Sequence, residues 1–427
     1  MIELTDALKE SARLRDESDL LARFRGYFYT EPGTVYLDGN SLGLLSRPAE
    51  ESILRVVHEW RVLAVEGWLD AESPWFTLAE SLATDTAELL GASADEVTIA
   101  NSTTVNLHQL LATLFAPDER RHAILADALS FPSDLYAVQS HLRLRGLDAG
   151  RSLKLVTSRD GLTLDEGDIV DAMTGEVAIV VLPSVLYASG QLLEMERLVT
   201  EAHRRGILIG FDCSHSIGAL PHALDEWGVD FAFWCSYKYL NCGPGAVGGL
   251  YLNRRHFDKA PGMAGWFGNR KTTQFDMNPV FDPALDAGRL HIGTPNILSL
   301  AALEGSLRIV HEAGIDRIRR KSLDLTEFLM ACADAELADL GVTVVNPREE
   351  ARRGGHVSLS HPEATRLCKA LKAARVVPDF RPPDIVRLAP VALYNTFHDC
   401  YQAVKAIKTI LLTGEHHRYE PGRGLVA

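Results

Sequence analysis

Short apolar runs alternate with longer amphipathic segments through the middle of the chain. Between about residues 77 and 310, segments with helical spacing of their apolar residues separate seven runs rich in Val, Ile and Leu. These runs, which we predict to be strands, are 97–100, 123–126, 153–156, 178–182, 207–211, 231–234 and 248–252. Strands that are apolar throughout and alternate with helices indicate a mostly parallel sheet covered on both faces. The pattern therefore predicts an α/β fold built on a seven-stranded sheet.

The two ends of the chain follow other patterns. Residues 5–28 are predicted to form a polar helix with Leu and Phe on one face, and a second long helix follows Pro48. After residue 310, the predicted helices are 315–335, 362–375 and 397–413, and the strand candidates are 342–345 and 356–360. This later pattern predicts a smaller α+β lobe.

These patterns divide the chain into three parts. We expect residues 61–310 to form a large cofactor-binding domain and residues 311–427 to form a small C-terminal domain. Residues 1–60 are expected to be an N-terminal segment that packs with the small domain.

Composition excludes several classes of function. A chain of 427 residues with 46% hydrophobic content can bury a large core. Its formal net charge of −14 argues against a general binder of nucleic acid or of anionic membranes. We find no apolar run long enough for a transmembrane helix and no secretory signal pattern at the N-terminus. The six scattered cysteines, without a CxxC pair, fit a reducing cytoplasm.

Lys238 stands where an apolar run ends. Residues 231–235 read as a buried strand, and Ser236, Tyr237 and Lys238 follow it directly, before the glycine-rich turn 243–245. Desolvation at such a position lowers the pKa of an amine and makes it a nucleophile. Taken alone, a lysine after a strand is more often a surface residue.

A second strand end supplies a partner for this lysine. The predicted strand 207–211 runs directly into Asp212, and Ser214 and His215 follow it. A strand-terminal lysine and a strand-terminal aspartate are what a pyridoxal phosphate (PLP) site needs. The lysine binds the cofactor as a Schiff base, and the carboxylate pairs with the ring nitrogen. Because an opposite charge favours the cationic form, Asp212 would keep that nitrogen protonated and the ring a good electron sink.

Two further strand ends carry complementary groups. The hydroxyls of residues 102–104, after strand 97–100, can form a phosphate site at a helix start, and they can equally cap that helix. After strand 123–126, Phe131 could stack on a flat ring and Asp134 could meet a ring substituent, although a proline turn explains both residues. Open α/β sheets bind ligands at the carboxyl ends of their strands, so the four strand ends together predict one cofactor site.

With these residues in hand, the chain resembles the kynureninase family of PLP enzymes. The motifs that carry the resemblance occur in order at residues 38–43, 103–108, 131–134, 211–215, 236–241, 265–268, 293–295 and 386–395. The resemblance implies the PLP-dependent transferase fold of type I, related to class V aminotransferases. It implies hydrolysis of L-kynurenine, or of a ring-substituted kynurenine such as 3-hydroxykynurenine, to the corresponding anthranilate and L-alanine. It also implies a cytoplasmic homodimer with a shared active site in tryptophan catabolism.

The resemblance further implies a role for each matching residue. Lys238, Tyr237 and Asp212 would be catalytic, with Tyr237 as a proton donor or acceptor. The residues implied to contact the cofactor are Thr103, Thr104, Phe131, Ser133, Asp134, Asp212, His215, Tyr237, Lys238, Trp266 and Thr294. Those implied to bind the substrate are Ser41, Trp68, Phe267 and Arg387, with Thr294 also lining that pocket. Trp266 would come from the partner subunit, and Arg387 would hold the α-carboxylate because its planar fork bonds a carboxylate bidentately.

The chain departs from the family pattern at two positions. Pro183 stands where a cofactor-binding Ser or Thr is expected, and Ser184 is the neighbour that could substitute for it. Cys242 replaces a small residue, which a cysteine of similar size tolerates. In the family, members that prefer 3-hydroxykynurenine commonly carry His, Ser and Asn at the positions of Trp68, Gly293 and Thr294. This chain therefore resembles the members that prefer unsubstituted kynurenine.

Other functions compete with this interpretation. A cysteine desulfurase would need a mobile catalytic cysteine, whereas Cys242 is too close to Lys238 in sequence to swing. A catalytically silent binding protein with the same fold would not need Lys238, Asp212 and Arg387 together. A metal enzyme is disfavoured because the histidines show no HExxH or HxH spacing.

Overall fold

All seven predicted central strands form one sheet in the computed structural model, which describes residues 5–422. Residues 1–4 and 423–427 lie outside the described residues, and with them the two extreme ends of the predicted N-terminal and C-terminal parts. The strands are β2 (Val97–Ile99), β3 (Ala123–Asp127), β4 (Leu153–Val156), β5 (Val177–Pro183), β6 (Leu208–Asp212), β7 (Phe231–Cys235) and β8 (Gly248–Leu252). Their order is β2-β8-β7-β6-β5-β3-β4. Only β8 runs against its neighbours, so the sheet is mostly parallel, as predicted.

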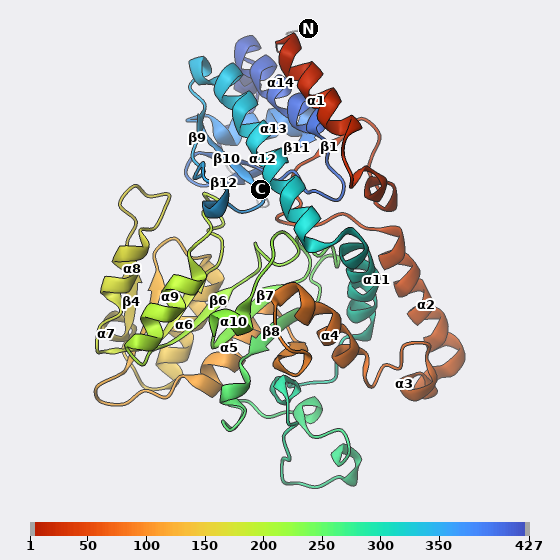
Figure 1. Ribbon diagram of the computed structural model, residues 1–427, viewed down its shortest axis with the longest axis vertical. Helices are drawn as coiled ribbons and strands as arrows, with labels where there is room; N and C mark the ends of the chain where they lie inside the picture. Colours follow the sequence, from red (N-terminus) through yellow and green to blue (C-terminus); the bar gives the residue numbers. More distant parts are fainter. Residues whose placement is uncertain (1–4, 423–427) are drawn as a thin grey trace.

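Alternate side chains of each strand enter different cores, because successive residues of a strand point to opposite faces. In β7, Phe231 and Phe233 pack in one cluster, whereas Ala232 and Trp234 pack in the other. Helices cover both faces (Figure 1). They are α4 (Leu78–Leu90), α5 (Thr103–Leu114), α6 (Pro132–Leu144), α7 (Ala149–Ser152), α8 (Glu166–Ala172), α9 (Met195–Arg204) and α10 (Leu224–Trp227). This double cover explains why the strands are apolar throughout.

The C-terminal part forms the smaller α+β lobe at the top of Figure 1. An antiparallel sheet of order β12-β13-β10-β9 packs on helices α12 (Ile315–Leu337), α13 (Ala364–Ala373) and α14 (Phe397–Thr413). Its strands are β9 (Thr343–Val344), β10 (Val357–Ser360), β12 (Asp379–Arg381) and β13 (Ile385–Leu388). The predicted helices and strands of this lobe are confirmed to within a few residues. Strand β12, which positions part of the site, was not among the predicted elements.

The N-terminal segment contacts both lobes. Helix α1 (Asp6–Glu17) packs against α14, and β1 (Val35–Tyr36) pairs with β11 (Val376–Val377) of the small lobe. Helix α2 (Arg47–Leu63), capped by Ser46, packs instead against α11 (Ile297–Ala313), and the short α3 (Gly67–Asp70) follows it. The division near residue 60 stays a prediction.

The single helix predicted for residues 5–28 is wrong. Helix α1 ends at Glu17, and a separate 3-10 turn occupies Ala22–Tyr27. The Asp19 carboxylate accepts a hydrogen bond from the Leu21 amide at 2.8 Å. Short polar side chains that bond the nearby backbone stabilise turns against helix, which explains the break.

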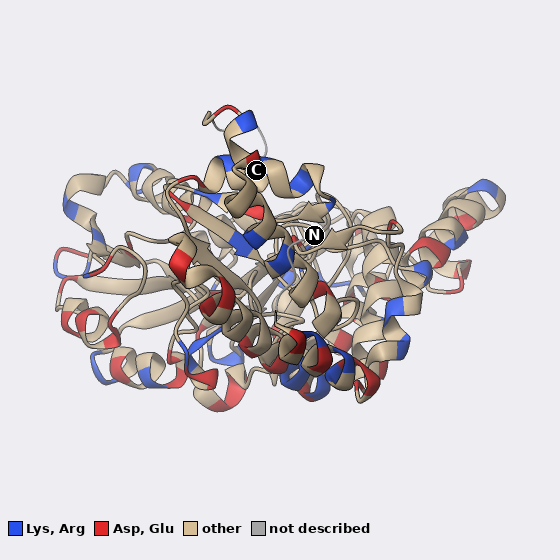
Figure 2. Cartoon of the chain, turned by 90° about the horizontal axis from the view of Figure 1, so that it is seen from above, with Lys and Arg blue, Asp and Glu red and all other residues tan. Residues whose placement is uncertain are grey.

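Charged residues lie mainly on the outer helices, where acidic and basic side chains are interspersed (Figure 2). Among residues 5–422, none of the helices combines the length and apolar composition that a membrane span requires.

Candidate active site

A cavity of about 300 Å³ lies at the carboxyl ends of β5, β6 and β7, facing the small lobe. Most of the predicted site residues line it, namely Ser41, Thr103, Thr104, Phe131, Ser133, Asp134, Asp212, His215, Tyr237, Lys238 and Arg387. The large sheet, the starts of α5 and α6, the 38–43 loop and the small lobe all contribute to the wall. The cavity therefore lies where an open α/β sheet is expected to bind its ligand.

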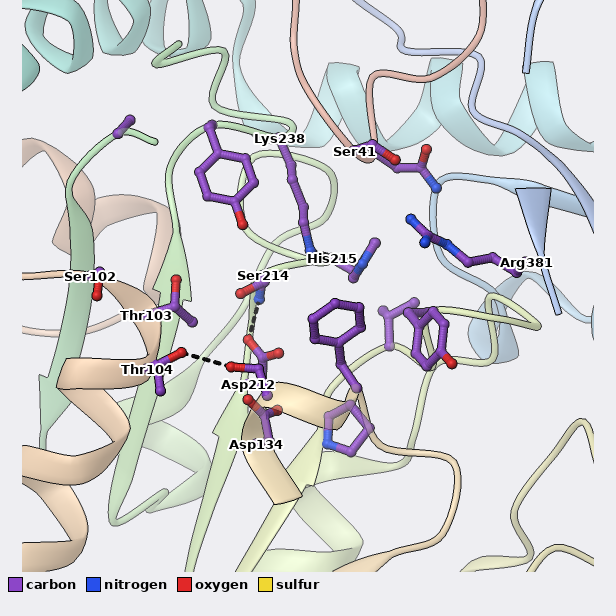
Figure 3. A pocket seen from close by; sticks show the side chains of 18 of the residues that line it. Ser41, Ser102, Thr103, Thr104, Asp134, Asp212, Ser214, His215, Lys238 and Arg381 are labelled. Carbon is purple, nitrogen blue, oxygen red and sulfur yellow. Dashed lines mark hydrogen bonds between the residues drawn. The ribbon is translucent and has the colours of Figure 1, made fainter. Parts of the chain in front are cut away.

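Lys238 is presented by a tight turn after β7. The strand ends at Cys235, and the Asn241 amide donates to the Lys238 carbonyl at 2.9 Å. Asn241 has a φ of 54°, a left-handed conformation that asparagine tolerates better than most residues. The Lys238 Nζ atom points into the cavity and lies 2.9 Å from His215 Nε2 (Figure 3). Burial, and then the charge of Lys238, hold the pKa of His215 well below its usual range, so this imidazole is neutral.

The 38–43 loop is pressed against this turn. The Gly43 amide donates to the Tyr237 carbonyl at 2.7 Å. A Cβ atom at Gly43 would overlap the Lys238 carbonyl and the Asn241 side chain, so only glycine allows this approach. The contact fixes Ser41 at the rim of the cavity beside Lys238.

Two carboxyl groups lie together on the floor of the cavity. Asp212, at the end of β6, accepts a hydrogen bond from the Ser214 amide at 2.8 Å. Asp134, in the first turn of α6, lies beside Asp212 in the wall of the same cavity. Burial, and then the negative charge of Asp212, raise the pKa of Asp134 well above its usual range. Asp134 is therefore a carboxyl that favours its protonated form.

The start of α5 forms an anion-binding end of the cavity. Ser102 is the N-cap residue, and Thr103 and Thr104 begin the helix. The Thr104 hydroxyl lies 2.7 Å from that of Ser133, on the first turn of α6 (Figure 3). Unpaired backbone amides at a helix start, with hydroxyls beside them, are suited to a phosphate group.

The wall beside Asp212 is less polar than the sequence suggested. Pro183 lines the cavity, whereas Ser184 does not and is fully buried. The Ser184 hydroxyl donates to the Asp212 carbonyl at 2.9 Å and lies 2.8 Å from the Ser216 hydroxyl. Ser184 therefore supports the end of β6 from behind, and it does not face the cavity in the way that a substitute for a cofactor-binding residue at position 183 would. The ring of Phe131 meets that of Tyr187 edge-on, with 5.4 Å between centroids.

The small lobe closes the cavity with buried charges. Arg387, on β13, has a side chain that is 1% exposed, and burial lowers its pKa while Asp379 opposes this shift. It donates to the Tyr187 carbonyl at 2.7 Å and to the Ser41 hydroxyl at 3.0 Å, and it forms an ion pair with Asp379. Arg381, which sequence reasoning missed, also lines the cavity. The signal that could have found Arg381 is its position six residues before Arg387, either side of a two-proline turn.

Four predicted site residues lie outside this cavity. Trp68 and Phe267 contact each other, with 6.1 Å between ring centroids, and Trp266 and Thr294 are exposed. None of the four is among the residues that line the cavity of the described chain. They belong to the segments around α3 and 262–296, the second of which protrudes at the bottom of Figure 1.

The cysteines do not support a mobile thiol. All six are buried and unpaired, and burial raises the pKa of Cys242 to about 12. A thiolate that attacks a substrate needs exposure and a lowered pKa. Among the described residues, no cluster of His, Cys, Asp and Glu could hold a metal ion.

Comparisons with known proteins agree with the motifs. The family model described as the kynureninase C-terminal domain matches residues 318–407. The kynureninase of Geobacillus thermodenitrificans is 53% identical over 418 residues, covering 98% of each chain. That of Bacillus anthracis is 53% identical over 412 residues, covering 96% of each chain.

Solved structures of the same fold are more distant in sequence. Cysteine desulfurase from Thermococcus onnurineus superposes with a TM-score of 0.78 at 20% identity, covering 92% of this chain and 98% of its own. C-DES, with glycine covalently linked to its PLP cofactor, superposes with a TM-score of 0.79 at 18% identity, covering 90% and 98%. These likenesses establish the fold.

Proposed function

Because this chain belongs to the kynureninase family, we propose that its cavity binds PLP and hydrolyses a kynurenine to an anthranilate and L-alanine. The observation that carries the proposal is the convergence of Lys238, Asp212 and the start of α5 on one cavity. The family relationship gives the reaction, and this convergence gives each group a physical task.

The residues of the cavity fit PLP. The amides and hydroxyls at the start of α5 would take the phosphate, and the Asp212 side chain would face the ring nitrogen. Phe131 offers a flat apolar face to the ring, and Lys238 supplies the amine that binds the cofactor covalently. When bound, PLP is an electron sink that accepts the charge left as bonds at the substrate carbons break. The remaining chemistry falls to side chains of this chain.

Lys238 would move the proton at the substrate α-carbon, because its amine enters the cavity in which the cofactor and substrate would be bound. Neutral His215 holds Nζ of Lys238 at the cavity wall without adding a second positive charge. Tyr237 lines the same wall, and burial raises the pKa of its hydroxyl, which keeps it protonated and suits it to donate a proton. Water adds to the aryl ketone of the substrate, the Cβ–Cγ bond breaks, and the anthranilate and L-alanine leave.

We predict that the purified protein with added PLP converts L-kynurenine to anthranilate and L-alanine in equal amounts. The kcat/KM should be higher for L-kynurenine than for 3-hydroxykynurenine, since Trp68, Gly293 and Thr294 match kynurenine-preferring members. A single added hydroxyl changes affinity modestly in an apolar pocket, so a ratio of roughly 10 to 100 is expected. Chromatography of the products and steady-state rates measure both.

Sulfide release from cysteine without anthranilate from either kynurenine would favour a desulfurase instead. A higher kcat/KM for 3-hydroxykynurenine would overturn the substrate preference and leave the reaction intact.

We also propose a homodimer in which each active site borrows residues from the partner. Trp68, Trp266, Phe267 and Thr294 lie outside the cavity of their own chain, although the family resemblance gives them contacts there. Large apolar side chains are exposed in the same two stretches of the chain, at Leu54, Val57, Trp60, Val62, Val65, Leu69, Phe275, Met277, Val280, Leu285 and Leu298. Exposed apolar patches of this kind mark protein interfaces.

The dimer proposal predicts rescue between two inactive variants. A dimer of one Lys238→Ala chain and one Trp266→Ala chain has one site with both defects and one native site. After subunit exchange, about a quarter of the wild-type activity should return, since half of the dimers are mixed and half of their sites are native. Rate measurements on the mixture test this.

The matched control mixes Lys238→Ala with Asp212→Asn, two defects on the same side of the site. No mixed dimer then contains a native site, so no activity should return. Equal behaviour of the two mixtures would show that Trp266 does not act across the interface.

The proposed reaction would take place in the cytoplasm. The support is that all six cysteines are buried and unpaired, which fits a reducing compartment. No nucleic-acid or membrane partner is proposed.

A further inference from the structure

Arg381 enters the cavity from the small lobe, on the side opposite Thr103 and Thr104 (Figure 3). It is the last residue of β12, and its side chain is 22% exposed. Its guanidinium lies 5.9 Å from the ring centroid of Tyr187, another residue of the cavity wall. A cation that is largely desolvated and faces a cavity is a binding group for an anion.

The two arginines of the cavity differ in how their nitrogens are used. Both terminal nitrogens of Arg387 are engaged by the protein: Nη1 by the Tyr187 carbonyl, and Nη2 by Ser41 and Asp379. Arg381 contacts Asp379 through Nε at 2.9 Å. Within residues 5–422, no hydrogen bond of its two terminal nitrogens is present, so this fork is open to a ligand.

One carboxylate orients both arginines. Asp379, 1% exposed, lies opposite Arg387 across the β12–β13 pair, and its Oδ2 atom meets both guanidinium groups. Two guanidinium groups therefore share one carboxylate oxygen. The charges of both arginines also act on a second carboxyl, Asp38, whose pKa burial and then Asp379 raise to about 6.

We propose that Arg381 is a second carboxylate-binding residue, which contacts the α-carboxylate of the amino-acid substrate beside Arg387 and makes the site selective for amines that carry a carboxylate. This inference rests on the proposed function for the identity of the substrate. Arg381 supplies the two open donors, and Asp379 is the positioning residue that holds the arginine pair.

The test compares two ligands that differ only in the carboxylate: L-alanine, which is the proposed product, and L-alaninamide. Isothermal titration of the PLP-loaded protein gives a Kd for each. Arg381→Gln should weaken L-alanine binding by about 10-fold to 100-fold, because it removes hydrogen bonds to a charged group, and should change L-alaninamide binding by less than about twofold. Arg381→Lys should fall between, since lysine keeps the charge and loses the fork.

Arg366→Gln is the matched control. Arg366 lies in the same lobe and is paired with Glu363, outside the cavity. Arg366→Gln should leave the affinities for L-alanine and L-alaninamide unchanged. With L-kynurenine as substrate, Arg381→Gln should raise KM more than it lowers kcat.

If Arg381→Gln weakened the binding of L-alanine and L-alaninamide equally, Arg381 would have a structural role only, and the inference would be overturned. Unchanged L-alanine binding in Arg381→Gln would also overturn the inference, because Arg387 would then be the sole carboxylate partner. A wild-type protein that binds L-alanine no better than L-alaninamide would overturn it as well. Failure of the proposed function is a separate result: the wild type would bind L-alanine selectively and leave kynurenine uncleaved.

Discussion

Replacing Lys238 by alanine should reduce the rate of kynurenine cleavage by at least about 10³-fold, because in the proposed mechanism this one side chain both binds the cofactor and moves a proton. The truncation leaves His215 without its 2.9 Å partner and removes the only lysine that lines the cavity of the described residues. The absorbance band of bound PLP at about 420 nm should also shift or disappear. Turnover rates and absorbance spectra of the purified variant measure both effects.

Lys154→Ala is the control for this change. Lys154 lies on β4 of the same sheet and pairs with Glu176 near the surface, outside the cavity. Its replacement should leave turnover and spectrum unchanged. A Lys238→Ala protein with wild-type turnover would show that the reaction occurs elsewhere.

Replacing Asp212 by asparagine should lower kcat by about 10² to 10³-fold, because a fixed charge that stabilises the reacting system is removed. The variant keeps the shape of the cavity floor, including an oxygen that can accept from the Ser214 amide. In the proposed site, loss of the carboxylate would leave the ring nitrogen of PLP without an anionic partner, and the cofactor would then accept electrons poorly. Single-turnover rates at saturating PLP separate this effect from weaker cofactor binding.

Asp134→Asn is the matched comparison, because it changes the other carboxyl of the same pair. Asp134 already keeps its proton, since burial and Asp212 raise its pKa well above the usual range. A neutral amide therefore replaces a neutral acid, and kcat should fall by less than about tenfold. If Asp134→Asn were the more damaging change, Asp134 and not Asp212 would be the ionised group.

The half of the site on the large sheet could be predicted from the sequence. Each group follows an apolar strand, and parallel strands bring their carboxyl ends to one edge, so Asp212 and Lys238 meet there although 26 residues separate them. The strands themselves were recognisable because both faces of the sheet are covered. The details behind that edge could not be predicted from the sequence. Whether Pro183 or Ser184 faces the cavity depends on the side of the sheet to which the strand turns each residue.

The half of the site on the small lobe could not be predicted in the same way. Arg381 lies on the three-residue strand β12, which is too short to show a period of two. Its relation to Asp379 and Arg387 arises from antiparallel pairing across a two-proline turn, and local composition does not reveal such a register. The expected contribution of Trp266 depends on a second copy, for which a single sequence carries only the signal of exposed apolar residues.

Lys238 is the residue on which the proposed chemistry depends most. The most direct test reduces the PLP-loaded wild-type protein with borohydride, which fixes the cofactor to its amine, and then maps the peptides by mass spectrometry. We expect one pyridoxyl group per chain, on the peptide that contains Lys238, and none at that peptide in Lys238→Ala. A label on another lysine of the wild type, such as Lys271 in the aromatic cluster outside the cavity, would contradict the assignment of Lys238 as the cofactor-binding residue.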